Sequence, residues 1–167
     1  MQNVVISYAL FLLLPIVMIG CHGMRPPHLG VKDGRLAPCP DSPNCVSSQS
    51  TDAAHSVAPL TYTTTSADAV ADLRKIIDGI KRAVIIEETA TYLHIEFTSA
   101  LLRFVDDVEF LADDAEKKIH VRSASRVGYS DLGVNRRRVE RIRQSWEQQR
   151  CLRARFWPPR HLWPRAA

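Results

Sequence analysis

Between residues 59 and 146, apolar side chains recur with two different periods, and each period predicts one kind of element. The helical period begins after Thr65, which forms a capping box with Asp68. One face of this predicted helix carries Val70, Leu73, Ile76, Ile77 and Ile80. Because an amphipathic helix buries its apolar face, we expect this helix to pack on a sheet.

The strand period of two marks the segments around that helix. In residues 92–98, Leu93, Ile95 and Phe97 alternate with polar side chains. Similar strand-like segments are 59–63, 83–87, 104–111 and 118–123. The connections at 88–91 and 112–117 are short and polar, so they predict antiparallel hairpins.

A second helical stripe follows near the carboxyl end. It begins near Asn135, an acceptable N-cap residue, and places Val139, Ile142 and Trp146 on one face. The resulting order of strand, helix, four strands and helix is typical of the α+β class. We therefore expect a single small α+β domain, with an antiparallel sheet of about five strands and two helices packed on one face.

The amino terminus holds a membrane signal. Residues 4–20 form an uncharged, mostly apolar run of 17 residues that contains Pro15. A permanent span needs about 20 apolar residues, so we favour a cleaved signal peptide over residues 1–20. An uncleaved single-pass helix and a plain secretory signal are the alternatives.

The apolar run ends in Met18-Ile19-Gly20-Cys21, which resembles the bacterial lipobox. Cys21 is therefore the predicted lipidation site, where acyl chains such as palmitate hold the protein to a membrane. The expected location is the cell envelope, facing the periplasm. Because His22 rather than Asp follows the cysteine, this is the outer membrane if the source is Gram-negative.

Two further cysteines, Cys39 and Cys45, flank a turn-forming stretch with two prolines, an Asp and an Asn. In an oxidising envelope we expect them to form a disulfide. A zinc site is a poorer interpretation, because no His or further Cys stands nearby to complete four ligands. Free or redox-active thiols are the remaining alternative.

Composition and charge narrow the range of partners. With 46% hydrophobic and 24% charged residues, the 167-residue chain has an ordinary globular composition and room for one domain. Residues 1–135 hold 12 basic and 16 acidic side chains, whereas residues 136–167 hold 10 Arg and 2 Glu. A positive charge confined to one end suggests anionic lipid as a surface partner rather than nucleic acid.

The basic end also contains Trp146, Phe156, Trp157 and Trp163, a composition that suits a membrane interface. Its prolines forbid a continuous amphipathic helix, so a disordered tail is the alternative. The expected organisation is a signal peptide at 1–20, a lipid-anchored flexible tether at 21–38, an α+β domain at 39–150 and a basic aromatic tail at 151–167.

The densest polar cluster lies where the last predicted strand leads into the second helix. It resembles an anion cradle, because arginines, hydroxyls and the free amides of a helix start all donate hydrogen bonds. The candidate anion-binding residues are Arg122, Ser123, Ser125, Arg126, Asp131, Asn135, Arg136 and Arg138. The competing and favoured interpretation is structural, with the supporting carboxylates Asp106 and Asp107 pairing with Arg122 and Arg126 to fix the loop.

Catalysis is the least favoured interpretation of this cluster. Strand alternation puts Asp106 and Asp107 on opposite faces, and His94 and His120 are interpreted as sheet-face residues. The sequence contains no P-loop, dinucleotide fingerprint, HExxH or Gly-x-Ser-x-Gly motif. No catalytic residue, metal or cofactor is therefore expected.

Three long stretches are similar to one known family. They are Leu36 to Ser48 (LAPCPDSPNCVSS), Phe104 to Phe110 (FVDDVEF) and Val121 to Arg136 (VRSASRVGYSDLGVNR). Over about Leu29 to Arg143 the chain resembles the bacterial and plant family catalogued as domain of unknown function 1499. Lipobox-bearing amino termini are familiar in that family, but the resemblance implies no reaction, cofactor or catalytic residue.

These observations together predict an uncharacterised envelope lipoprotein. Its domain is expected to bind an anionic or lipid-like ligand, or a protein partner, near Arg122 to Arg138 without catalysing a reaction. A hydrolase or transferase of unknown substrate is one alternative, and a structural envelope protein without a ligand is the other.

Overall fold

Four strands joined by hairpins form the centre of the fold. The structure is a computed structural model that describes residues 23–156, with side chains up to Arg153. Its elements in chain order are β1 (Val31–Lys32), β2 (Arg35–Leu36), β3 (Cys45–Ser47), β4 (Leu60–Thr61), α2 (Ser66–Asp78), β5 (Ala83–Glu88), β6 (Tyr92–Thr98), β7 (Val105–Asp113), β8 (Lys118–Ser125) and α3 (Val134–Phe156). The signal peptide and Cys21 lie outside the described residues.

The main sheet has the strand order β3-β8-β7-β6-β5, and β4 pairs with β8 as well. Each pairing between its strands is antiparallel, as the short polar connections predict. The register places Ile95 opposite Val108 and Phe110 opposite Val121. These four residues are buried on one face of the sheet, which fixes the register because a slip by one residue would expose them.

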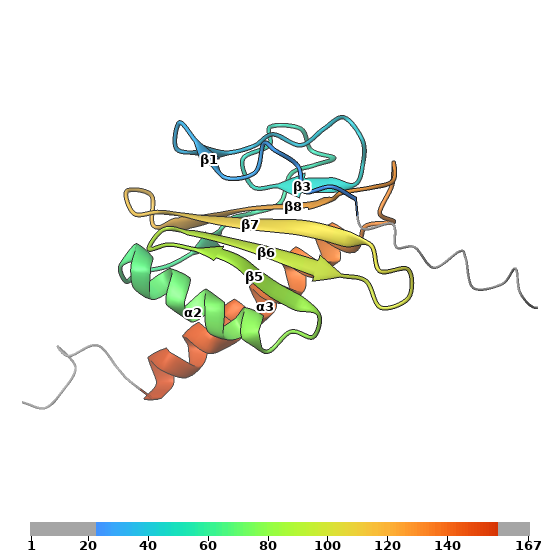
Figure 1. Cartoon of the computed structure of the whole chain (residues 1–167). Helices are drawn as coiled ribbons and strands as arrows, with labels where there is room; N and C mark the ends of the chain where they lie inside the picture. Colours follow the sequence, from blue (N-terminus) through green and yellow to red (C-terminus); the bar gives the residue numbers. More distant parts are fainter. Residues whose placement is uncertain (1–22, 157–167) are drawn as a thin grey trace, which may run out of the picture.

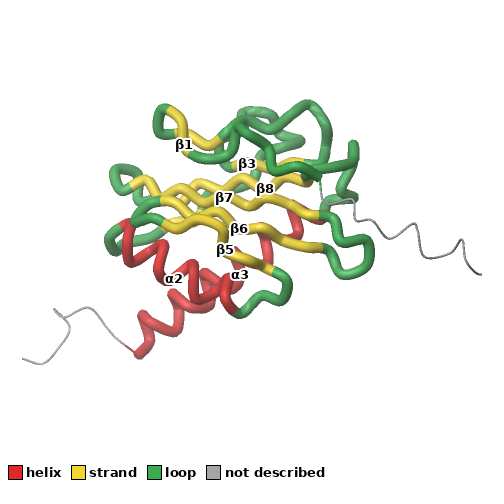
Figure 2. The backbone as a smooth tube through the Cα atoms, viewed as in Figure 1, coloured by secondary structure: helices red, strands yellow, loops and turns green. Residues whose placement is uncertain are grey.

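Both described helices cover that apolar face (Figures 1 and 2). In α2, Thr65 caps the helix by accepting the Asp68 amide at 3.2 Å, as the capping box predicts. The helix buries Leu73 and Ile77 against the sheet, and α3 buries Ile142. The prediction of an α+β domain with two helices on one face is therefore confirmed for the described residues.

The predicted number of strands is wrong. The five expected strands are present as β4 to β8, but the structure has eight strands in two sheets. The additional strands are β3, which joins the main sheet, and the separate pair β1 and β2. Each of these is only two or three residues long, so none is long enough to show an alternation of period two.

The carboxyl helix also differs from expectation at both ends. Asn135 lies inside α3 with a buried side chain, and the carboxylate of Asp131 accepts the amides of Gly133 and Asn135 at 2.8 and 2.7 Å. Asp131 therefore caps the start of α3 in place of Asn135. At the other end α3 continues to Phe156, so the expected domain boundary after residue 150 falls within a helix.

Residues 23–44, here called the N-terminal arm, cover the opposite face of the sheet (Figure 1). The arm contains β1 and β2, and Leu36 packs with Tyr92 and Leu111. The expectation of a flexible tether is therefore wrong for residues 23–38. Proline and glycine are common in spacers, but here they shape turns of a segment bound to the sheet. No helix within residues 23–156 is long and apolar enough to cross a bilayer.

The core gives a direct test of the fold. Phe110 is fully buried between the sheet and the helices, and replacing such a side chain by alanine costs about 3–5 kcal/mol. We expect Phe110→Ala to lower the free energy of unfolding in urea by this amount. Val31→Ala, on exposed strand β1, is the matched control and should change it by less than about 0.5 kcal/mol. Equal losses in the two variants would contradict this assignment of the core.

Candidate anion-binding site

The sheet face under the N-terminal arm carries charged side chains that are almost completely buried. Alternate residues of β7 point to this face and supply Asp107 and Glu109, which are 1% and 0% exposed. Arg122 on the neighbouring strand β8 is 3% exposed. Burying a charge is costly unless it is paired, so each of these groups needs an oppositely charged or hydrogen-bonding partner on this face.

Asp107 is held by Arg126 and His94. The Arg126 guanidinium donates from Nε to Oδ2 and from Nη2 to Oδ1, both at 2.7 Å, and His94 Nε2 donates to Oδ1 at 2.8 Å. Burial alone would raise the pKa of Asp107, but these hydrogen bonds outweigh it and lower the pKa to about 2. Arg126 also pairs with Glu96, to which Arg25 of the arm donates. Two carboxylates therefore pair with Arg126, through its Nε and Nη2.

Glu109 joins the arm to the sheet. Its Oε1 accepts the backbone amide of Gly30 at 2.7 Å and the hydroxyl of Tyr92 at 2.8 Å, and its Oε2 accepts Arg122 Nη1 at 3.3 Å. Burial raises the pKa of Tyr92, and the nearby charge of Glu109 raises it further, so this hydroxyl stays protonated and donates at neutral pH.

Arg122 is different because its donors are largely unused. Its one hydrogen bond within the described residues is the long bond to Glu109. Its Nε is buried and has no partner there. A buried, unpaired polar group costs about 1–3 kcal/mol, and such groups are rare in native proteins. Arg122 therefore retains donor capacity that another molecule would satisfy.

A pocket of about 570 Å³ lies beside Arg122, between the arm and the sheet. Pro38 and Cys39 line its arm side, while Asp107, Arg122 and Arg126 line its sheet side. This volume is within the range of about 300–1,000 Å³ that is usual for small-molecule sites. The pocket therefore brings an under-used buried cation next to space for a ligand.

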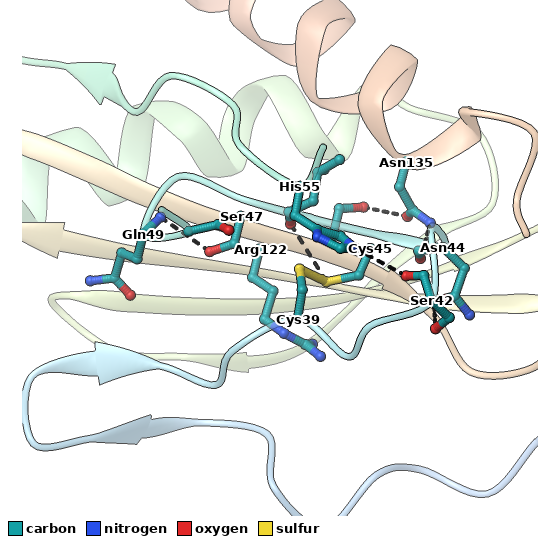
Figure 3. Close-up of a disulfide and its surroundings, with 12 residues drawn as sticks. Cys39, Ser42, Asn44, Cys45, Ser47, Gln49, His55, Arg122 and Asn135 are labelled. Atoms are coloured by element: carbon teal, nitrogen blue, oxygen red, sulfur yellow. Dashed lines mark hydrogen bonds between the residues drawn. A yellow bond between two sulfur atoms is a disulfide. The ribbon is translucent and has the colours of Figure 1, made fainter. Parts of the chain in front are cut away.

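The predicted disulfide forms one wall of this pocket. Cys39 and Cys45 are bonded, with their Cα atoms 5.6 Å apart, which confirms the pairing. Figure 3 shows the Arg122 side chain running past the disulfide, with its guanidinium beside Cys39. Because Cys45 belongs to β3 of the main sheet, the disulfide fixes the arm at the point where it meets Arg122.

The other predicted cradle residues lie on the helix face of the sheet. Arg138 pairs with Asp106 and donates to Asn135 Oδ1 at 2.6 Å, which also accepts from Ser123 Oγ at 2.6 Å. Asn135 Nδ2 then donates to Ser125 Oγ at 3.0 Å. These residues satisfy one another and fix α3 on β8, as the structural interpretation proposes.

Arg136 points elsewhere again. It donates to the carbonyl oxygens of Ser56 and Ala54 at 2.7 and 2.8 Å, which fixes the loop before β4. The prediction of one convergent cradle is therefore wrong. Neighbouring residues of a strand face opposite sides, so Arg122 and Arg126 face the arm whereas Ser123 faces α3. The predicted pairing of Asp107 with Arg126 is present, but Asp106 pairs with Arg138 and Arg122 with Glu109.

One known protein family matches this chain. The family model described as "Protein of unknown function (DUF1499)" matches residues 35–145. The chain belongs to the DUF1499 family. The match contains Asp107, Glu109, Arg122 and the disulfide, and confirms the resemblance seen in the sequence. Neither a curated protein nor a solved structure matches the chain.

The sequence of this DUF1499 domain contains one local signal for the buried array. Polar residues recur at every second position of β6, at Tyr92, His94 and Glu96, and again on β7, at Asp107 and Glu109. Such a stripe ordinarily marks a solvated sheet face. Only the cover supplied by the arm turns it into a buried site, and the Pro- and Gly-rich composition of the arm indicates a tether instead.

Among residues 23–153, the remaining polar groups do not form a second site of comparable kind. His120 Nδ1 lies 3.3 Å from Ser48 Oγ, which already accepts the Val121 amide at 2.9 Å, and burial lowers the pKa of His120. Within the described part of the chain, no group of three metal-ligating side chains comes together. A larger pocket of about 940 Å³ lies between β1, β2 and residues 47–55, but its charged residues, such as Lys32 and Asp52, are exposed and solvated.

The aromatic residues of the basic end require one correction. Trp146 was expected at a membrane interface, but it is 4% exposed in the core and its Nε1 donates to the Thr61 carbonyl at 2.9 Å. A tryptophan at helical spacing with Val139 and Ile142 belongs to the same buried stripe. The side chain of Phe156, together with Trp157 and Trp163, lies outside the described part.

The low pKa of Asp107 predicts a specific acid sensitivity. Native Asp107 stays ionised down to pH about 2, whereas the unfolded chain binds this proton near pH 3.9. Between these values the unfolded state binds more protons, so stability falls as the pH falls, by about 2 kcal/mol for this group. We expect urea unfolding between pH 5 and about 2 to show this loss for the unmodified protein. Asp107→Asn should be less stable at pH 7 but lack this component. An unchanged pH dependence in the variant would contradict the pairing.

Proposed function

We propose that this DUF1499 protein is a non-enzymatic binding module of the cell envelope that takes an anionic group of its ligand, a carboxylate or a phosphate, on Arg122. The observation that carries the proposal is the buried Nε of Arg122, unpartnered within residues 23–153, beside a pocket of about 570 Å³. A planar guanidinium matches the oxygen atoms of either anion.

The surrounding charges support Arg122 rather than Arg126 as the ligand-binding cation. Arg126 already makes charge-assisted hydrogen bonds with both oxygens of Asp107 and pairs with Glu96. Arg122 shares Glu109 with Gly30 and Tyr92, and its own bond to that carboxylate is the longest of the three at 3.3 Å. An incoming anion would therefore meet least competition at Arg122.

The state of Asp107 favours binding over proton transfer. A general acid or base works best with a pKa near the operating pH, whereas the hydrogen bonds of Asp107 lower its pKa to about 2. Its partner His94 is buried and directed at the same carboxylate. These groups form a fixed platform for the pocket and have no place in a proton-transfer step.

The lipid anchor is the second part of the proposal. The apolar run at residues 4–20 and the lipobox-like Met18-Ile19-Gly20-Cys21 support a signal peptide and a lipid on Cys21. The arm begins two residues later and leads directly into the pocket wall. We infer a module held close to the membrane surface on the periplasmic side, at the outer membrane if the cell is Gram-negative.

The ligand site is tested by adding inorganic phosphate, and separately acetate, during thermal unfolding. An anion that binds the native state at 100 times its Kd stabilises by about 2.7 kcal/mol, so we expect a higher Tm for the unmodified protein with at least one of the two. Arg122→Gln should abolish this rise. Arg136→Gln is the matched control and should retain it, because neither Arg136 nor the carbonyl groups it binds line the pocket. An unchanged rise in Arg122→Gln would contradict the proposal.

The anchor is tested by Cys21→Ser in the full chain. Without the thiol no lipid is attached, so we expect the protein to leave the membrane fraction and the acyl mass to disappear from its intact mass spectrum. A variant that stays in the membrane fraction with unchanged gel mobility would contradict the anchor and favour an uncleaved helix.

A further inference from the structure

Three connections and the entry point of the chain lie at one end of the main sheet. Thr98 pairs with Val105 and Asp106 with Ser125, so the β6–β7 connection and the end of β8 lie together. The amide of Thr98 also donates to the carbonyl of Arg82 at 3.0 Å, which places the α2–β5 connection at the same end. Figure 1 shows the 99–104 and 127–133 loops at this end, here called the entry end.

The chain enters the fold at this same end. Gly23, the first described residue, lies so close to the end of β8 that a Cβ atom on it would be 2.9 Å from side-chain atoms of Arg126 and Val127. Cys21 is two residues earlier, and two residues span at most about 7 Å. Whatever holds Cys21 at a membrane therefore holds the entry end beside that membrane.

The entry end carries the most exposed apolar side chains of the described residues. Leu101 and Leu132 are 86% and 84% exposed. The five most exposed large apolar residues, which are Met24, Leu101, Leu132, Tyr129 and Leu102, all belong to this end. Scattered single leucines on a surface need no explanation, but a group on adjacent loops marks an interaction surface.

The charges at the entry end match an anionic bilayer. Lys81, Arg82, Arg103 and Arg137 are exposed there, and they outnumber the exposed carboxylates, which are Asp78 at the end of α2 and Asp41 before β3. Basic residues next to a membrane are attracted to anionic headgroups, and apolar or tyrosine side chains sit at the boundary between headgroups and acyl chains. Such a boundary favours loops whose exposed apolar side chains are flanked by basic residues.

We infer that the entry end docks on the lipid bilayer, with Leu101, Leu102, Tyr129 and Leu132 inserted at the headgroup boundary. The domain then has one fixed orientation on the membrane instead of hanging freely from its anchor. This inference rests on the anchoring part of the proposed function and is independent of Arg122. It assigns to the 99–104 and 127–133 loops a role that neither the pocket nor the core explains.

The test uses the full, membrane-extracted chain in vesicles of phosphatidylethanolamine and phosphatidylglycerol that contain a nitroxide-labelled lipid. In a Cys151→Ser background, which removes the exposed free thiol, a nitrobenzoxadiazole fluorophore is attached at Leu101→Cys or Leu132→Cys. Val31→Cys is the matched control, because β1 lies towards the opposite end of the sheet (Figure 1) and Val31 is 45% exposed. We expect a blue shift and several-fold stronger nitroxide quenching at positions 101 and 132 than at position 31.

Each other outcome overturns the docking surface in a recognisable way. Equal quenching at all three positions, in protein that floats with the vesicles, would show an anchor without docking. A blue shift at Leu101→Cys without quenching would show that a second copy of the chain covers the surface. Protein that does not float with the vesicles would remove the anchor and the docking surface together, while leaving phosphate or acetate binding at Arg122 to be judged by its own thermal shift.

Discussion

The two carboxylates of Asp107 and Glu109, fully buried on one face of β7, are the charges that every polar contact around Arg122 and Arg126 must balance. A carboxylate without solvent must be paired or protonated, and the structure pairs both. Arg122 comes from β8 and Arg126 directly follows that strand, while the backbone of Gly30 closes the array from the arm. The same requirement that binds the arm to the sheet leaves Arg122 incompletely used, because Glu109 also serves two other donors.

Local sequence patterns predicted the helices and strands that bury one apolar face against the core. Thr65 with Asp68 marks the start of α2, and alternating Leu93, Ile95 and Phe97 mark β6, because each pattern reports an apolar face against one core. Strands of two or three residues carry no such pattern, so local sequence does not predict β1 to β3. Whether a Pro- and Gly-rich segment is a spacer or a cover depends on contacts with distant residues, which local composition does not report.

The residue types that form the site were predictable from the sequence, but which of them come together was not. Alternation correctly placed Asp106 and Asp107 on opposite faces, and charge suggested Arg126 as a partner for Asp107. The same alternation, applied to β8, would have separated Arg122 from Ser123 and divided the supposed cradle into two networks. No local pattern reports how deeply a side chain is buried. In the sequence Arg122 looks like an ordinary exposed arginine, but because it is buried it needs a hydrogen-bond partner.

Native mass spectrometry of the full chain, extracted from its own membrane without added ligand, tests the central claim most directly. The account predicts that the unmodified protein carries one small anionic molecule, and that Arg122→Gln, purified in parallel, is folded and has lost that mass. If both proteins carry the same molecule, or if neither carries one, Arg122 is not a ligand-binding cation and the buried array serves only to hold the arm on the sheet.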